Sequence, residues 1–583
     1  MSGGFRRDNH GARWSAFFLA ALCALAAEIS PQNYQADINY LASPELRGRA
    51  TGSAELEKAA QFIAGKFQSF GLTAEQQAFP VIVGAHLGPN NSLGSAPSSD
   101  FQPFSFSASG SITAPVVFAG YGITDKESHY DDYAGIDVTG KLVLILRHEP
   151  RESKQMSSHA ALAEKAVNAK MHGAKGVLLV NDVYAHAQPN NALDKFGLSA
   201  GPTDSGIFFV QVRPALAEQW IPKDQLRSLT NGINRDRKPH SFPIEGLTLS
   251  LSVDIQRDSK TVHNVTAYLP GQTDEYVIIG AHYDHLGLGD EHSLAPSQIG
   301  KVHPGADDNA SGTAGVIELA RWFASQPKPK RGILFITFAG EELGLLGSSW
   351  YVNHPTLPLE KAVAMINMDM IGRIREGKVY LGGTGTGSTF DKLLAGENAP
   401  KPLQIIHSDK TGYGSSDHTS FTTKQIPTLF FFSGLHGDYH KPSDTPDKID
   451  SADAAKLLDY IAGITARLES DPGRPEFVRV AEPSTPAATS GGGSGYGPAF
   501  GSIPDFNEPP KGVRFADVRE GTPAAKAGLK PGDILIEFDG KEIGNLYDFT
   551  YALRAHKPGD VVLVKVIRGS QTIEAKVLLT ERR

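Results

Sequence analysis

The chain has 583 residues, of which 40% are hydrophobic and 21% are charged, and its formal net charge is −8. This length exceeds what one hydrophobic core usually serves, so the sequence predicts two to four domains. The composition is that of an ordinary globular protein and excludes an intrinsically disordered or membrane-embedded chain. The acidic balance and the lack of a lysine- or arginine-rich tract argue against nucleic acid as a partner.

The N-terminus has the pattern of a secretory signal. Arg6, Arg7 and Arg13 flank the apolar run WSAFFLAALCALAA, which ends in small residues. This run is shorter than the about 20 residues of a membrane-spanning helix. We therefore expect residues 1–27 to be cleaved and the protein to be secreted or periplasmic, with no membrane contact beyond this segment; a retained anchor is the alternative. Cys23, the only cysteine, would leave with the signal.

Two different sequence patterns follow between residues 28 and 243. A helical periodicity runs from Ile38 to about Glu75, where LEKAAQFIAGKFQSFGL places apolar residues on one face. Further on, the β-like runs PVVFAGYGI and GKLVLILRHEP precede a helical stretch, AALAEKAVNAKMHGA, and the buried-strand run GVLLVND. We expect residues 28–110 to begin the main domain and residues 111–243 to form a separate β-rich domain.

Strands and helices alternate between residues 244 and 470. The runs YVIIGAH, GILFITFAG, AVAMINMDMIG and TLFFFSG are typical of buried strands, and GTAGVIELARWFAS is typical of a helix. This alternation predicts an α/β domain whose ligands gather beyond the carboxyl ends of the strands. A linker rich in Pro, Ser and Gly is expected at 471–495, where a flexible coil of about 24 residues would span roughly 25–30 Å. A compact β-rich module is expected at 496–583.

Potential metal ligands end several segments of the α/β region. They are His282 and Asp284, Asp307 and Asp308, Glu341 and Glu342, Asp369, and, in the polar cluster GDYHKPSDT, His440. Each of these groups alone has a simpler structural explanation. An acidic pair before a helix is usually a helix cap, and an acidic pair after a strand is usually part of a solvated turn. Their convergence on one sheet edge makes the ordinary explanation improbable. Imidazoles with carboxylates suit zinc, and a set of this size suits two ions better than one.

In order, spacing and flanking residues, the run from His282 to Thr445 resembles the dizinc aminopeptidase family, which includes bacterial leucyl aminopeptidases, glutamate carboxypeptidase and the transferrin receptor. The stretch LASPELRGRATGS near the N-terminus resembles the opening helix and loop of that family. The resemblance implies a three-layer, mixed-sheet α/β zinc exopeptidase domain that binds two Zn²⁺ ions. The implied ligands are Asp308 as the bridge between the ions, His282 and Asp369 on one ion, and Glu342 and His440 on the other.

Some of these assignments have rivals. Asp307 is the alternative bridge, and His436 is the alternative last ligand, although the family spacing YHxxxDT favours His440. The resemblance also implies that Asp284 orients the His282 ring and that the peptide bond after Asp308 is cis.

The resemblance also implies a division of labour between the adjacent glutamates. Glu342 would bind metal, whereas Glu341 would act as the general base that takes a proton from a metal-bridged water and passes it to the leaving amine. Tyr439 resembles the phenol that helps to hold the oxyanion in some members, and Tyr413 is the alternative donor. Asp417 and the histidine after it are expected to be structural.

Two accessory domains are implied by resemblance. The runs VVFAGYGI, GKLVLIL and GAKGVLLVND resemble a protease-associated domain, which shapes access to the cleft or mediates oligomer contacts. VREGTPAAKAGLKPGDILIEFDGKEI resembles a PDZ domain of the bacterial protease-linked type. Its carboxylate-binding loop would lie near Phe500 to Ile503, although Ser502 stands where a second apolar residue is common. Such a domain would capture a peptide C-terminus by strand addition, or it would only pack or space.

The sequence thus predicts an exported zinc aminopeptidase acting on peptides. A carboxypeptidase of the same family is the nearest alternative, but it would need cationic groups to bind a carboxylate, and apart from Arg373 no dedicated arginine cluster is found beside the site motifs. Glutaminyl cyclisation on a related scaffold is a second alternative. An inactive receptor or interaction protein is the third, and the presence of all five ligands and Glu341 argues against it.

Overall fold

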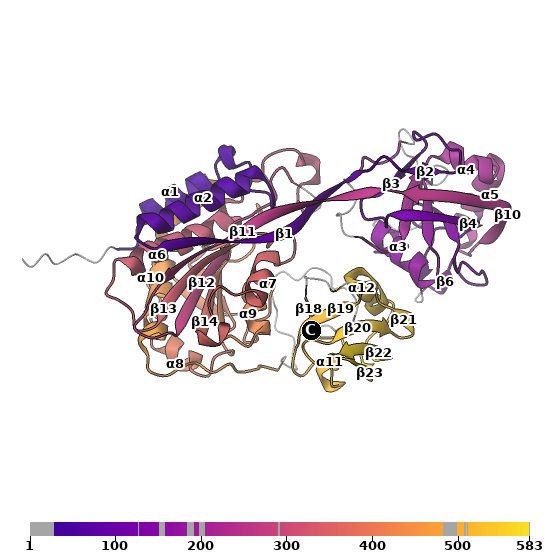
Figure 1. Cartoon of the computed structure of the whole chain (residues 1–583). Coiled ribbons are helices and arrows are strands. Elements are labelled where there is room, and N and C mark those ends of the chain that lie inside the picture. The colour runs from indigo at the N-terminus through magenta and orange to yellow at the C-terminus, as the bar shows by residue number, and fades with distance from the viewer. Residues whose placement is uncertain are drawn as a thin grey trace, which may run out of the picture.

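The computed structural model describes residues 28–125, 128–150, 158–182, 192–197, 204–289, 292–481, 498–505, 509 and 511–581. The expected signal segment and most of the expected linker lie outside these residues. The described residues form three domains, each with its own sheet and its own hydrophobic core (Figure 1).

The first domain is built on a mixed eight-stranded sheet. Its strands, in spatial order, are β1 (Thr73–Leu87), β11 (Ile255–Leu269), β13 (Gly332–Phe338), β12 (Tyr276–His282), β14 (Ala362–Met368), β17 (Thr428–Phe432), β15 (Lys378–Gly382) and β16 (Gln404–His407). The four central strands, β13, β12, β14 and β17, are parallel. Their carboxyl ends therefore meet at one edge of the sheet.

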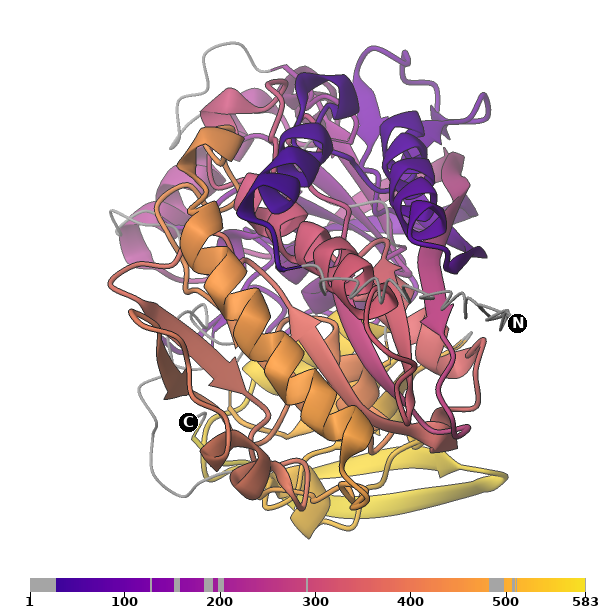
Figure 2. The same cartoon turned by 90° about the vertical axis from the view of Figure 1, so that its left-hand side faces the viewer.

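Helices cover both faces of this sheet. Alternate residues of β12 point to opposite faces: Val277 belongs to the core under one helical layer, and Ile278 belongs to the core under the other. The first layer contains α1 (Pro31–Leu41), α2 (Ala54–Ser69), α6 (Gly312–Ala324) and α10 (Ser451–Ser470), and Figure 2 shows it from outside with α10 in orange. The second layer contains α7 (Leu346–Asn353) and α9 (His418–Thr423), and α8 (Phe390–Ala395) packs against α10. The expected three-layer mixed-sheet fold is confirmed.

The inserted domain is built on a seven-stranded sheet and is reached by a long arm. Strands β1 and β11 pair along their lengths and extend from the first domain to the second (Figure 1). The sheet contains, in spatial order, β2 (Ser92–Leu93), β10 (Phe242–Val253), β4 (Gly110–Phe118), β7 (Leu142–Leu146), β8 (Gly176–Val180), β9 (Phe208–Val212) and β3 (Phe101–Pro103). Its other elements are β5 (Thr124–Asp125), β6 (Tyr130–Asp131), α3 (Leu162–Met171), α4 (Pro214–Trp220) and α5 (Lys223–Asp236).

The C-terminal domain is a small sheet with two helices. Its elements are β18 (Ser502–Pro504), β19 (Val513–Val518), β20 (Ile534–Phe538), β21 (Lys541–Glu542), β22 (Val561–Arg568), β23 (Gln571–Leu578), α11 (Pro523–Lys526) and α12 (Leu546–Arg554). Helix α12 packs against α3 of the inserted domain, where Lys170 forms an ion pair of 2.8 Å with the buried Asp548. The Tyr551 hydroxyl donates to Asn168 across the same contact.

The N-terminal region differs from the continuous helical pattern expected between Ile38 and Glu75. Helix α1 ends at Leu41, and α2 begins only after Ser53, whose side chain caps it by accepting from Leu56 N. The segment between them contains residues with positive φ, including Arg49 at 49°, which a helix cannot accommodate. No helix among the described residues combines the length and apolar character that crossing a bilayer demands.

Candidate active site

The side chains expected at the site come from the carboxyl edge of the parallel strands. His282 is the last residue of β12, Glu341 and Glu342 follow β13, and Asp369 follows β14. Asp308 lies in an irregular turn directly before α6, and its peptide bond to Asn309 is cis, as the resemblance implies.

Asn309 holds this turn against the end of β14. Its amide nitrogen donates to Met368 O at 3.1 Å, and its amide oxygen accepts from Met370 N at 3.2 Å. These two contacts flank Asp369, so one side chain sets the position of Asp308 relative to Asp369.

Three donor atoms form a first group. His282 Nε2 lies 3.4 Å from Asp308 Oδ1 and 3.5 Å from Asp369 Oδ1. Asp369 Oδ1 is buried and has no hydrogen-bond partner among the described residues. The three atoms therefore lie close to one another, and Asp369 Oδ1 is left without a bond to another described group.

A second group uses the other oxygen of Asp308. His440 Nε2 lies 3.2 Å from Asp308 Oδ2 and 3.1 Å from Glu342 Oε2. His440 has a φ of 54°, which residues other than glycine rarely adopt. Its ring is oriented by a 3.0 Å contact between Nδ1 and His292 O. Burial lowers the pKa of His440, but hydrogen bonds to Asp308 and Glu342 outweigh it and raise this pKa to about 11.

These separations fit two metal ions. Two ligands on one tetrahedral zinc, each about 2.0–2.1 Å from it, lie about 3.3 Å apart. The observed donor-to-donor distances of 3.1 to 3.5 Å bracket this value. The site also gathers five carboxylates, Asp284, Asp308, Glu341, Glu342 and Asp369, in a largely buried space. Such an excess of negative charge is what divalent cations offset.

Glu341 lies beside the first group and is not part of it. Its Oε2 is 3.8 Å from His282 Nε2, and its backbone N–H donates to Asp284 Oδ1 at 3.1 Å. Burial raises the pKa of Glu341 well above its usual range; the charge of His282 opposes this shift, and the charges of Glu342 and Asp369 add to it. The pKa of the neighbouring Glu342 is instead lowered. Burial raises this pKa, but hydrogen bonds from His285 and His440 outweigh the effect of burial and bring the pKa to about 2.

Asp284 lies next to the His282 ring. Its Oδ1 is 3.6 Å from His282 Nδ1, slightly beyond hydrogen-bond length, and its Oδ2 accepts from Thr51 Oγ1 at 2.7 Å. The hydrogen bonds from Thr51 Oγ1 and from the Glu341 backbone N–H hold the Asp284 carboxylate beside the His282 ring. This is the position that the resemblance implies for a group that orients the ring.

The two candidate tyrosines occupy different places. The Tyr439 ring stacks on His440 with centroids 3.9 Å apart, and burial, with the nearby Asp308 and Glu342 charges, raises the pKa of its phenol. The Tyr413 hydroxyl instead donates to Asp517 of the C-terminal domain. Of the two, only Tyr439 stacks against a member of the donor groups.

The rival ligands pair with each other. His436 Nε2 lies 3.1 Å from Asp307 Oδ2, and Asp307 Oδ1 accepts from Gly372 N at 2.7 Å. Both side chains are buried. Asp307 and His436 thus form a separate pair beside the donor groups. The buried His418 stacks on Phe430 with centroids 4.2 Å apart.

Two residues of the site were not identified from the sequence. His285 Nδ1 lies 2.7 Å from Glu342 Oε1, and its position after HYD, on the loop that follows β12, was the available signal. Arg49 is fully buried beneath the site and donates to the carbonyl oxygens of Leu41, Tyr283, Pro304 and Gly305. Burial lowers the pKa of Arg49 to about 10, against the raising effect of nearby carboxylates such as Asp284 and Asp308. The arginine of LRGRATG gives no local sign of these partners.

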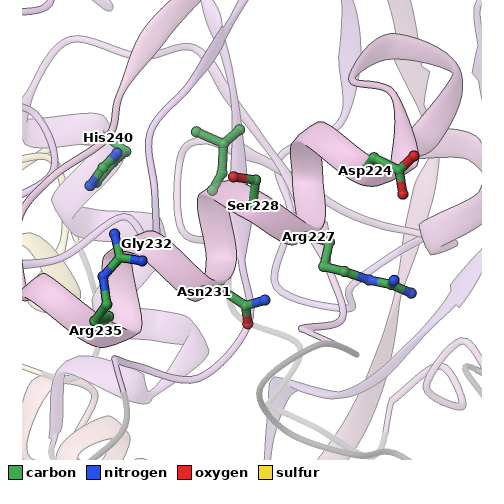
Figure 3. A pocket seen from close by; sticks show the side chains of 8 residues that line it. Asp224, Arg227, Ser228, Asn231, Gly232, Arg235 and His240 are labelled. Carbon is green, nitrogen blue, oxygen red and sulfur yellow. The ribbon is translucent and has the colours of Figure 1, made fainter.

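An open hollow of about 460 Å³ lies along α5 in the inserted domain (Figure 3). Asp224, Arg227, Arg235 and His240 are among its lining residues. It lies in the inserted domain, whereas the donor groups lie at the strand ends of the first domain, so it is not part of this site.

Comparisons with known proteins agree with the domain types. Residues 264–465 match peptidase family M28, residues 112–217 match the PA domain, and residues 482–579 match the PDZ domain. Aminopeptidase YwaD of Bacillus subtilis (strain 168) is 26% identical over 449 residues, which cover 74% of this chain and 83% of that protein. A probable leucine aminopeptidase of Arthroderma otae is 28% identical over 215 residues, which cover 35% of this chain and 57% of that protein. The solved aminopeptidase from Aneurinibacillus sp. strain AM-1 aligns with 26% identity and a TM-score of 0.48, covering 79% of this chain and 98% of that chain.

Proposed function

We propose that this metallo-exopeptidase, whose residues 264–465 match peptidase family M28 and which carries an inserted PA domain and a C-terminal PDZ domain, is an exported, zinc-dependent enzyme that removes N-terminal residues from peptides. The observation that carries the proposal is the pair of donor groups that share Asp308 beside the uncoordinated carboxylate of Glu341.

The proposed zinc ligands are the five residues of the two donor groups. His282, Asp308 and Asp369 would hold one ion. Asp308, Glu342 and His440 would hold the other, since His440 Nε2 lies 3.2 Å from Asp308 and 3.1 Å from Glu342. Zinc bound there would supply Lewis acidity, which makes water nucleophilic at neutral pH and stabilises negative charge on a carbonyl oxygen.

The side chains around the donor groups would carry the proton and hold the substrate. Glu341 is largely shielded from solvent, and its raised pKa suits a group that accepts a proton and later donates it to the leaving amine. Asp284 fixes the Glu341 backbone by accepting from its N–H. The Tyr439 phenol, stacked on His440, is our candidate donor to the developing oxyanion.

The charges around the site support cleavage at the amino end of a peptide. A carboxypeptidase needs a free cation for the terminal carboxylate, but Arg373 is paired with Asp438 at 3.1 Å, and Arg49 is buried among carbonyl groups. Two zinc ions would offset four of the five carboxylate charges at the site, and the remaining negative charge would attract an ammonium group. The presence of both complete donor groups and Glu341 argues against an inactive receptor, and glutaminyl cyclisation remains the alternative reaction.

The PDZ domain is proposed to capture a peptide C-terminus by strand addition at β18. Strand β18 lies at the edge of its sheet; Arg519 N donates to Gly501 O, and Asp505 N donates to Arg514 O, so these residues face β19. The alternating residues Ser502 and Pro504 then face the outer edge. Because proline has no N–H, this edge supports only a short pairing, which leaves packing or spacing as the competing role.

An activity panel tests the proposal. Purified full-length protein is assayed on four kinds of substrate. They are aminoacyl anilides, the same anilides with a blocked amino group, peptides with a blocked amino group and a free carboxylate, and N-terminal glutaminyl peptides. We expect hydrolysis of the free-amine substrates only, with loss on chelation and recovery on adding zinc. Hydrolysis of blocked substrates from their carboxyl end, or release of a cyclised product, would contradict it.

A further inference from the structure

We propose that His285 is a positioning residue for Glu342: its Nδ1–H donates to Glu342 Oε1 and turns Glu342 Oε2 toward His440 and Asp308. This inference rests on the proposed function, because Oε2 is the atom assigned there to the second zinc ion. It adds a residue that belongs to neither of the two proposed ligand sets.

The distances separate a hydrogen-bond partner from a ligand. The 2.7 Å between His285 Nδ1 and Glu342 Oε1 is the length of a charge-assisted hydrogen bond. Two atoms on one tetrahedral zinc would instead lie about 3.3 Å apart. His285 Nδ1 is also 3.9 Å from Asp308 Oδ2, whereas His440 Nε2 is 3.2 Å from that atom. The geometry of His440 fits a ligand, and that of His285 fits a donor to Glu342.

The two imidazoles contact different oxygens of the Glu342 carboxylate. His285 takes Oε1, and His440 lies 3.1 Å from Oε2. An ionised carboxylate has no hydrogen to donate, so the ring must carry its proton on Nδ1. Each oxygen of Glu342 therefore has one task, and the carboxylate cannot rotate without breaking the His285 bond.

Packing holds the His285 ring in place. The side chain is fully buried, and its backbone N–H donates to Arg49 O at 3.2 Å. Gly305 has a φ of 57°, and a Cβ there would lie 2.5 Å from Cγ and Cδ2 of the ring. Only glycine leaves room for the imidazole, so the loop before Asp308 is shaped around His285. Its Nε2 is buried without a hydrogen-bond partner among the described residues, which leaves Nδ1 as the polar atom that the ring uses.

The positioning role predicts a change in zinc affinity with an unchanged number of ions. His285→Leu removes the donor, whereas His285→Asn places an amide N–H near the position of Nδ1. We expect His285→Leu to bind two zinc ions at saturation but with the weaker site about 10- to 100-fold weaker. His285→Asn should recover most of this loss. Zinc content by elemental analysis and affinity by competition with a chromophoric chelator measure both quantities without any peptidase assay.

Two further histidines provide matched references. His418→Leu removes another buried imidazole that stacks on Phe430, and it should leave both zinc affinities unchanged. His440→Leu should lose one ion outright, as expected for a ligand. If His285→Leu does not fold, His285→Gln replaces it, because its amide lies near the Nε2 position and also removes the Nδ1 donor.

The outcomes separate this inference from the proposed function. Failure of the unmodified protein to bind two zinc ions overturns the proposed function itself. If the unmodified protein binds two ions and His285→Leu binds them with the same affinities, the positioning role is wrong. If His285→Leu saturates at one ion, as His440→Leu does, His285 is a ligand and the positioning role is again wrong.

Discussion

Tyr413 donates its hydroxyl hydrogen to Asp517, a buried carboxylate of the C-terminal domain. The other oxygen of Asp517 accepts from Arg479 Nη1 at 2.9 Å. Three residues after Tyr413, Ser416 Oγ accepts from the side chain of Asn367 at 2.9 Å, on the strand that leads to Asp369. One loop therefore joins the docking of the PDZ domain to the floor of the candidate active site.

Breaking this bond should loosen the PDZ domain. Tyr413→Phe and Asp517→Asn each disturb the same contact, so we expect each to increase protease cleavage in the linker expected at 471–495. Their effects on the free energy of unfolding should not add, because they act on one interaction. A double-mutant cycle by chemical denaturation measures this, and full additivity would show that the two side chains act separately.

The two tyrosines should differ in catalysis. Tyr439→Phe removes the proposed donor to the oxyanion, and we expect kcat for a small anilide to fall about 10²-fold with zinc content unchanged. Tyr413→Phe is the matched control, because its hydroxyl is bound to Asp517. A larger loss of kcat in Tyr413→Phe than in Tyr439→Phe would reverse the assignment.

Variants of the two adjacent glutamates should differ in the amount of zinc that they bind. Glu341→Gln keeps the size of the side chain and removes the proton acceptor, so kcat should fall about 10²- to 10⁴-fold while two zinc ions remain bound. Glu342→Gln should weaken one zinc site, because an amide is a poorer ligand than a carboxylate. Excess zinc should partly restore Glu342→Gln only. The opposite pattern of metal loss would mean that the assignment is shifted by one residue.

Removing zinc should also lower the melting temperature. Without a cation, the largely buried carboxylates of Asp308, Glu342 and Asp369 repel one another. At 100 times the dissociation constant of a site, zinc bound at that site should stabilise the folded protein by about 2.7 kcal/mol. Calorimetry across a zinc titration measures this shift, and a melting temperature that does not depend on zinc would contradict the site.

Arg49 should be essential for stability. Its guanidinium is fully buried and bonds to Tyr283 O, Pro304 O and Gly305 O, so Arg49→Met leaves those carbonyl groups unsatisfied. We expect a loss of about 3–5 kcal/mol in the free energy of unfolding, measured with denaturant at saturating zinc. Arg49→Lys should recover only part of it, because an ammonium lacks the planar fork of donors. A loss below about 1 kcal/mol in Arg49→Met would show that water replaces the guanidinium.

The alternation of strands and helices predicted an α/β first domain, and the family resemblance predicted its three layers. Buried strands such as β12 and β13 appear as continuous apolar runs, and the parallel arrangement places their carboxyl ends together. His282 and Glu342 could therefore be assigned to one edge before their distances were known.

The sequence could not predict contacts between side chains that are distant in the chain. Arg49 and Tyr283 are 234 residues apart, and nothing around either residue indicates the other. The contact between His285 and Glu342, which are 57 residues apart, likewise became known only from distances. The contact between Lys170 and Asp548 depends on how two domains dock, which no local pattern encodes.

The hydrogen bonds of Arg49 can form only late in the synthesis of the chain, which delays the completion of the candidate active site. Its acceptors Pro304 and Gly305 lie 255 and 256 residues further along the chain. At about 5–20 residues per second, a ribosome needs roughly 10–50 s to make that interval, and ordering the long loop between the bonded groups adds further delay. Residue 440 and the rest of the second donor group come later still. A nascent chain that stops before residue 440 therefore lacks part of the second donor group, however far its earlier residues have folded.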